Sequence, residues 1–359
     1  MKRKKTILIA PLDWGLGHAS RCIPIIREII SLGHAVVIAT DGRALEFLKA
    51  EFPQVKCIKL QGYHPVYPKD EKMVMKMALQ IPKFFLAILR EHFELLSIVQ
   101  QHSIDAVISD NRYGLWLKGK PAVIITHQLF IRMPPKLKWM ESMIHQLNHF
   151  FIRKFSRCWV PDLQGDENLS GNLSHGANMP PNAEFIGMLS RFSSASSEKK
   201  YDLLILLSGP EPQRTILEKK IINQIKQLPF RTLVVRGVTE ENKRTQPTEM
   251  IEIISHLTSE KMNEALLQSD TVICRSGYSS VMELASLGKS AILIPTLGQT
   301  EQEYLAERLS EKSFFVMQNQ DTLNVQESLL KLKRLNRQKI PYGGNLFKEP
   351  LKNFLEGIS

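Results

Sequence analysis

The chain has 359 residues, of which 43% are hydrophobic and 23% charged, and its formal net charge is +11. This length suggests two domains of ordinary size, and the apolar content excludes a disordered chain. Because Cys22, Cys57, Cys158 and Cys274 form no CxxC pair, we expect no disulfide framework, no zinc site and a reducing, cytoplasmic location.

The first apolar run is too short for a signal peptide, and no apolar stretch is long enough to span a bilayer. Nucleic acid, an anionic membrane surface or an anionic substrate would each suit the positive charge. The charge is spread over both halves and no nucleic-acid-binding motif accompanies it. We therefore expect no nucleic-acid partner.

The N-terminal half alternates short apolar runs with helical patterns, which predicts a parallel sheet covered by helices. The first helical pattern runs through Ile23–Leu32. The expected strands are Lys5–Ala10, Ala35–Thr40, Val55–Leu60, Ile104–Ser109, Ala122–Thr126 and, as the last strand of this domain, Trp159–Asp162.

The first turn of this half is rich in glycine. Gly15-x-Gly17-x-x-Ser20 matches part of a dinucleotide-binding fingerprint, and Asp41 follows the second strand, where a ribose-binding acid belongs. An NAD-dependent oxidoreductase is one interpretation of this pattern, and it stays open at this point.

Two further polar residues follow expected strands. Asp110 and His127 come at strand ends, where open α/β sheets bind ligands. Asp110 is therefore a candidate catalytic carboxylate, with capping of the next turn as its alternative role. For His127 a structural role is the alternative.

Two stretches of this half combine apolar, aromatic and basic side chains. Met73–Gln101 is a broadly apolar helical pattern, and Leu129–Trp159 mixes aromatic residues with Arg153, Lys154 and Arg157. Such composition suits a membrane interface, and ordinary helices that cover a sheet have it too. Both interpretations remain open.

The second half repeats the alternation of strands and helices. After a loop at Leu163–Pro181, the domains are expected at 1–184 and 201–340, joined by a linker at 185–200, with 341–359 packing back on the N-terminal domain. The expected strands are Leu203–Leu207, Thr232–Arg236, Met250–Ile254, Thr271–Cys274, Ala291–Ile294 and Phe314–Val316.

The stretch Asp270–Gln302 carries the strongest functional pattern. A strand is followed by a turn at 275–280, by the helical spacing of Val281–Leu287, and by a second strand. Ser279 or Ser280 is placed to cap this helix, and the N–H groups of the helix start suit a phosphate or diphosphate. Glu283, one turn further on, is placed to bind ribose hydroxyls.

Polar side chains also surround the start of the following helix, and they suit sugar hydroxyls. They are Gln299, Glu301, Gln302 and Glu303. Contacts to phosphate, ribose and sugar, in that order, describe a nucleotide-sugar site.

Arg275-Ser276-Gly277 through Glu283, followed by Gly288, Pro295 and Gln302, closely resembles the C-terminal domain of the MurG-type N-acetylglucosaminyltransferases. The resemblance implies a GT-B fold, an α/β architecture of two doubly wound parallel-sheet domains that face each other across a cleft. It also implies UDP-N-acetylglucosamine or another UDP-sugar as donor.

The resemblance assigns roles to further residues. The N-terminal Gly-rich loop with Gly15 and Gly17 ends in His18, which occupies the place of the family's candidate general base. The loop after Leu203–Leu207 would touch the diphosphate. The donor residues so implied are Ser208, Arg214, His256, Leu257, Ser276, Gly277, Tyr278, Ser279, Glu283, Gln302 and Glu303.

We therefore expect an inverting glycosyltransferase that moves a sugar from a UDP-sugar to an acceptor hydroxyl on a glycan or lipid-linked acceptor. No metal or other cofactor is expected to be required, and no DxD-type motif is evident. The protein would be cytoplasmic, with peripheral binding to the inner face of the cell membrane. Alternatives are a nucleotide-sugar epimerase of the same fold, a non-catalytic nucleotide-sugar-binding protein and the NAD-dependent oxidoreductase.

Overall fold

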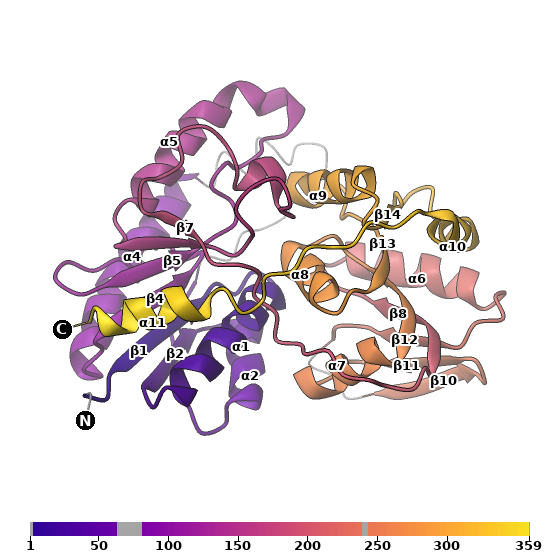
Figure 1. Ribbon diagram of the computed structural model, residues 1–359, viewed down its shortest axis with the longest axis horizontal. Helices are drawn as coiled ribbons and strands as arrows, with labels where there is room; N and C mark the ends of the chain where they lie inside the picture. The colour runs from indigo at the N-terminus through magenta and orange to yellow at the C-terminus, as the bar shows by residue number, and fades with distance from the viewer. Residues whose placement is uncertain (1–2, 63–80, 239–242, 359) are drawn as a thin grey trace. The chain divides into compact units, whose positions relative to one another are not determined.

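The computed structural model describes residues 3–62, 81–238 and 243–358, which form two compact units (Figure 1). One unit comprises Met1–Leu189 with Gly343–Ser359, and the other comprises Ser190–Tyr342. Over these described residues each unit contains one seven-stranded sheet, so the prediction of two α/β domains is confirmed.

The sheet of the first unit has the order β3-β2-β1-β4-β5-β6-β7, and all of its pairings are parallel. Its strands are β1 (Thr6–Pro11), β2 (Ala35–Thr40), β3 (Lys56–Lys59), β4 (Ala106–Asp110), β5 (Ala122–Ile125), β6 (Arg157–Val160) and β7 (Ala183–Phe185).

Both faces of this sheet are covered, as expected of a parallel sheet. Ile7 and Ile9 of β1 belong to a core with α1, α2 and α11, whereas Leu8 and Ala10 belong to a core with α4 and α5. The helices are α1 (Leu16–Ser31), α2 (Gly42–Glu51), α4 (Ile81–Gln101), α5 (Glu141–Ile152) and α11 (Lys348–Glu356), with short 3₁₀ turns η1 (Pro135–Met140) and η2 (Gly171–Leu173).

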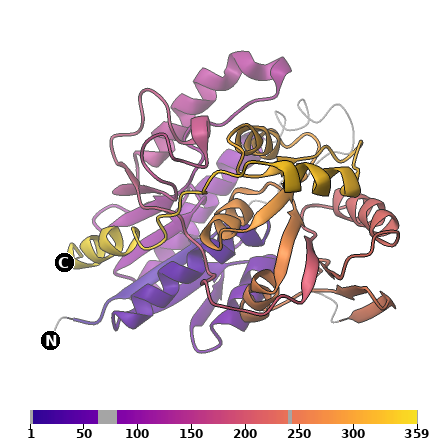
Figure 2. The same ribbon diagram turned by 45° about the vertical axis from the view of Figure 1, so that its right-hand side comes forward.

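The C-terminal helix α11 lies beside the N-terminal strand in both Figure 1 and Figure 2. Its Leu351, Phe354 and Leu355 are buried in the same core as Ile7. Lys5 Nζ also donates to the backbone oxygen of Leu355, at 2.7 Å. These contacts join the two ends of the chain within the first unit.

The sheet of the second unit has the order β10-β11-β9-β8-β12-β13-β14. Its strands are β8 (Tyr201–Leu206), β9 (Thr232–Val235), β10 (Arg244–Thr248), β11 (Ile251–Ile254), β12 (Ser269–Cys274), β13 (Ser290–Leu293) and β14 (Val316–Met317). Its helices are α6 (Gln213–Ile225), α7 (Ser259–Leu267), α8 (Tyr278–Ser286), α9 (Thr300–Glu311) and α10 (Val325–Arg334). Apolar residues of β8, α6 and α10 share one core.

The structure corrects three expectations about elements. The first sheet does not end at Trp159–Asp162, because β7 pairs with β6. The second sheet is not wholly parallel, because β10 runs antiparallel to β11 at its edge. The amphipathic stretch Leu129–Trp159 is divided among η1, α5 and β6. Of the expected helix at 73–101, residues 73–80 lie outside the described residues.

Candidate active site

The first unit gathers four polar side chains at the carboxyl edge of its sheet. His18 and Arg21 lie on α1, Asp110 is the last residue of β4, and His127 follows β5. Because β1, β4 and β5 are neighbours, the chain segments that follow them meet at this edge. The topology thus brings together residues that are about ninety positions apart in the sequence.

Direct contacts connect this cluster. His18 Nδ1 lies 2.7 Å from Asp110 Oδ1, and both carboxylate oxygens of Asp110 accept hydrogen bonds from Arg21. Another Arg21 nitrogen lies 3.2 Å from His127 Nδ1. Asp110 is 0% exposed, whereas the His18 side chain is 15% exposed. His18 is therefore the member of the pair that a substrate can reach, and Asp110 is placed to support it.

Electrostatics keep Asp110 ionised. Burial alone would raise the pKa of its carboxyl, but the charge of Arg21, the charge of His18 in its protonated form and the hydrogen bonds from both lower that pKa from 3.8 to about 2. An ionised carboxylate can only accept hydrogen bonds. Arg21 Nη2 also lies 3.1 Å from His18 Nδ1, but the contact of Nδ1 with Asp110 Oδ1 is shorter. We therefore assign the proton of neutral His18 to Nδ1, which leaves the lone pair of Nε2 free to accept a proton.

The glycine-rich turn that precedes His18 leaves the start of α1 open. Gly15 is the N-cap of α1, with a φ of 81°, and no side chain caps this helix. Gly17 lies in its first turn. Asp41, the acid of the dinucleotide pattern, is buried and accepts a hydrogen bond from Gly62 N of its own unit, at 2.9 Å.

In the second unit, α8 begins at Tyr278, three residues before the Val281 expected from the apolar spacing. Its N-cap is Gly277, and no side chain caps it, so the expected cap by Ser279 or Ser280 is wrong. Both serines lie inside the helix, and the ring of Tyr278 is buried. Among the described residues no side chain caps the start of this helix, and a helix start of this kind suits an anion.

Two side chains of the loop before α8 donate hydrogen bonds to the backbone of other segments of the second unit. Ser276 Oγ donates to the backbone oxygen of Gln302, at 2.8 Å. Arg275 is 2% exposed and donates to the backbone oxygens of Ile294, Pro295 and Gln213. Burial lowers the pKa of Arg275 to about 10. The sequence analysis gave Arg275 no role of its own, since its partners lie in distant loops.

Glu283 of α8 is held by an arginine that the sequence analysis also missed. Arg191 Nε donates to Glu283 Oε1 at 2.8 Å, and another Arg191 nitrogen donates to Ser259 Oγ at 3.0 Å. The guanidinium of Arg191 lies over the ring of Phe192. This ion pair is largely buried and fixes one oxygen of the carboxylate.

The other expected donor residues lie in loops at the carboxyl edge of the second sheet. Ser208 is exposed after β8, and His256 and Leu257 follow β11. The guanidinium of Arg214 is paired with Glu211 and Glu218, so carboxylates compensate the charge expected to meet a phosphate. The side chains of Gln302 and Glu303 accept from Thr296 N and Gly298 N, respectively, both at 2.9 Å.

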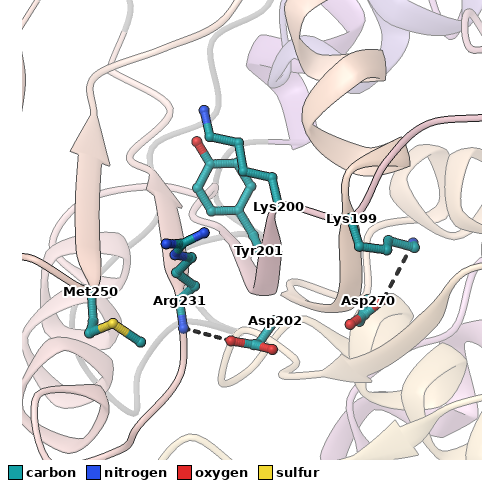
Figure 3. A pocket seen from close by; sticks show the side chains of 7 residues that line it. All are labelled: Lys199, Lys200, Tyr201, Asp202, Arg231, Met250 and Asp270. Carbon is teal, nitrogen blue, oxygen red and sulfur yellow. Dashed lines mark hydrogen bonds and ion pairs between the residues drawn. The ribbon is translucent and has the colours of Figure 1, made fainter.

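A hollow of about 280 Å³ lies at the opposite edge of this sheet, where β8 and β12 begin (Figure 3). Lys199 is paired with Asp270 there, and Arg231 N donates to Asp202. None of the expected site residues lines this hollow. We therefore place the candidate site at the carboxyl edges and not here.

Within residues 3–62, 81–238 and 243–358, no group of three or more His, Cys, Asp or Glu side chains is arranged to hold a metal ion. Over the same ranges, no helix combines the length and the apolar character needed to cross a membrane.

Comparison with known proteins places this geometry in context. Residues 205–354 match the glycosyltransferase family 28 C-terminal domain. A Haemophilus influenzae protein named UDP-N-acetylglucosamine–N-acetylmuramyl-(pentapeptide) pyrophosphoryl-undecaprenol N-acetylglucosamine transferase is 30% identical over 269 residues, which cover 71% of this chain and 70% of that protein. An uncharacterized glycosyltransferase of Methanosarcina acetivorans is 22% identical over 331 residues, or 86% of this chain and 82% of that protein.

Among solved structures, Acinetobacter baumannii MurG superposes with a TM-score of 0.59 at 14% identity. The superposition covers 99% of this chain and 100% of that one. At this identity the likeness concerns the fold, which both chains share over their whole length.

Proposed function

This chain belongs to the MurG-like family of GT-B glycosyltransferases and is a glycosyltransferase enzyme, and on that premise we propose that its donor is a UDP-sugar. The sugar is N-acetylglucosamine or another hexose. The name of the Haemophilus influenzae relative supports this choice, since it contains UDP-N-acetylglucosamine. Release of UDP from a UDP-sugar in the presence of an acceptor is the direct assay.

The contact between His18 and ionised Asp110 carries the proposed mechanism. His18 Nε2 takes the proton of an acceptor hydroxyl as the hydroxyl oxygen bonds to the anomeric carbon. The bond from that carbon to the UDP oxygen breaks in the same step, and UDP leaves with the electron pair. Attack opposite the leaving group inverts the anomeric configuration.

The second unit supplies the donor site in this proposal. The N–H groups and the partial positive charge at the start of α8 stabilise the charge that develops on the leaving diphosphate. Arg275 keeps the loop before α8 in place through its backbone contacts. Glu283 binds the ribose hydroxyls, with Arg191 fixing its orientation. With these groups in place, the proposed reaction does not require a metal ion.

Replacing Glu283 by alanine is expected to weaken UDP binding by about 1–3 kcal/mol, the cost of losing hydrogen bonds to a charged group. Calorimetric titration of the full chain measures this loss. Glu307→Ala, which removes an exposed carboxylate on α9, is the matched control and should bind UDP normally. Unchanged affinity in a folded Glu283 variant would remove this residue from the donor site.

We also propose that the acceptor is lipid-linked and that the first unit binds a membrane surface. Leu86, Leu89, Phe93 and Leu96 recur at helical spacing on α4 and are between 45% and 68% exposed. These large apolar side chains form a stripe on the surface of α4. Exposing such a stripe to water is unfavourable, so it is typical of a surface that binds a membrane or another protein.

Aromatic and basic side chains continue the surface beside this stripe. His92 stacks on Trp116 at 3.9 Å, next to Phe93. Lys154 Nζ lies over the rings of both Trp116 and the exposed Phe150. Aromatic rings with a lysine among them suit the boundary between anionic headgroups and acyl chains. Of the basic residues expected there, Arg157 instead lies in β6 and pairs with Glu184.

The double variant Leu89→Glu, Phe93→Glu is expected to lose binding to phosphatidylglycerol vesicles by about 100-fold or more, because insertion of each side chain contributes roughly 1.5–3 kcal/mol. Vesicle sedimentation at low and high salt measures the loss. Lys154→Glu should weaken only the salt-sensitive part of vesicle binding. Leu330→Glu, at an exposed leucine of α10, is the control. Wild-type protein that stays wholly in the supernatant would rule out the membrane proposal alone.

A further inference from the structure

Arg21 is a buried cation on the apolar side of α1. It is 1% exposed and is surrounded along the helix by buried residues such as Cys22 and Ile25. A buried arginine requires several hydrogen-bond acceptors, because an unpaired charge in the protein interior is strongly unfavourable. Here Asp110 accepts through both oxygens, and His127 Nδ1 lies beside another guanidinium nitrogen.

The ionisation of Asp110 depends on this arginine. Other titratable groups around the carboxylate are His18 and Cys22 of α1, His127 after β5, and Tyr113 after β4. Arg21 is the one among these contacts whose cationic charge does not depend on pH in the physiological range. Without it, a fully buried carboxyl is favoured in its protonated form.

The proton on Asp110 determines which nitrogen of His18 carries a proton. An ionised Asp110 accepts from Nδ1–H, as assigned above. A protonated Asp110 would instead donate to Nδ1, and the imidazole proton would then lie on Nε2. That tautomer cannot accept a proton at Nε2, the ring nitrogen that faces away from Asp110.

We propose that Arg21 is a positioning residue for the base: by holding Asp110 ionised, it keeps His18 in the tautomer whose Nε2 accepts the acceptor's proton. This inference rests on the proposed role of His18. It adds a residue that touches neither substrate. Arg21 contacts Asp110 and also lies beside the histidine, with Nη2 3.1 Å from His18 Nδ1.

Selective ¹⁵N labelling of histidine in the full chain tests the proposal, with His18→Gln identifying the His18 signals. Wild-type protein should show the Nδ1–H tautomer of His18, and Arg21→Met should show the Nε2–H tautomer. Turnover of Arg21→Met at neutral pH should fall about 100-fold or more, the scale of general-base catalysis. It should recover as alkaline pH ionises Asp110, while the KM for the donor changes less than about 3-fold.

Two variants complete the experiment. Arg27→Met, at an exposed arginine of the same helix that pairs with Glu51, should leave both the tautomer and turnover unchanged. Arg21→Lys keeps the charge but not the two-point contact, so it should retain the wild-type tautomer with turnover reduced about 3- to 30-fold. If Arg21→Met does not fold, the His18 tautomer measured in Arg21→Lys tests the proposal.

A wild-type tautomer or wild-type turnover in folded Arg21→Met would overturn the proposal, and so would the Nε2–H tautomer of His18 in folded Arg21→Lys. The tautomer measurement needs no substrate. A failure of the proposed sugar transfer is therefore distinguishable from a failure of the role of Arg21.

Discussion

Replacement of His18 by alanine is expected to lower turnover about 10²- to 10⁴-fold, the contribution typical of a positioned general base. The affinity for UDP should stay close to that of the wild type, because the proposed donor contacts come from the second unit. Initial rates of UDP release and calorimetric titration of UDP separate the two effects.

His102→Ala is a suitable control for this variant, since His102 follows α4 and contacts Lys56 outside the cluster. Full turnover in His18→Ala would remove His18 from the chemistry. Neither Asp110 nor His127 is then a ready substitute, because both are buried.

Asp110→Asn is expected to lower turnover by a similar factor, about 10²- to 10⁴-fold, for a different reason. The asparagine amide can donate to Nδ1 of His18 and so favour the unreactive tautomer. It also leaves Arg21 buried without its counter-ion, which should destabilise the fold by about 3–5 kcal/mol. Chemical denaturation and initial rates measure the two consequences separately.

The same carboxylate makes stability depend on pH. Because the pKa of Asp110 is about 2 in the folded chain and near 3.8 otherwise, the folded state binds this proton more weakly than the unfolded state. The stabilisation is fully present above about pH 4 and is lost as the pH falls towards 2, by about 2 kcal/mol. Asp110→Asn should lack this component. An identical loss of stability between pH 4 and 2 in both proteins would contradict the assignment.

Much of the fold follows from local patterns that the sequence displays. Ala35–Thr40 is apolar, β-branched and bounded by polar turns, and β2 has these bounds. The missed strands lack that signal. Arg244–Thr248 is exposed along its whole length, and Ala183–Phe185 is short and half-buried. Such edge strands are determined by pairing with a neighbour, which a single sequence does not show.

The candidate site likewise contains residues that the sequence indicates and residues that it does not. Asp110 was noticed because it ends a recognisable strand, and His18 because its glycine-rich loop resembles that of the MurG-type family. The contact between them follows only from the pairing of β1 with β4. Arg21 and Arg191 lack a local signal. Arg21 lies within an apolar helix, and Arg191 lies in a polar linker. The role of each depends on a carboxylate that folding places beside it, 89 residues away in the sequence for Arg21 and 92 for Arg191.

The most direct test of the account is acceptor-dependent UDP release, measured with a panel of UDP-sugars and lipid-linked acceptors for the wild type and His18→Ala. We expect one UDP-sugar to support release that requires an acceptor and that falls about 10²- to 10⁴-fold in the variant. Acceptor-independent release or epimerisation, NAD binding in place of UDP binding, or UDP-sugar binding without any turnover would contradict it.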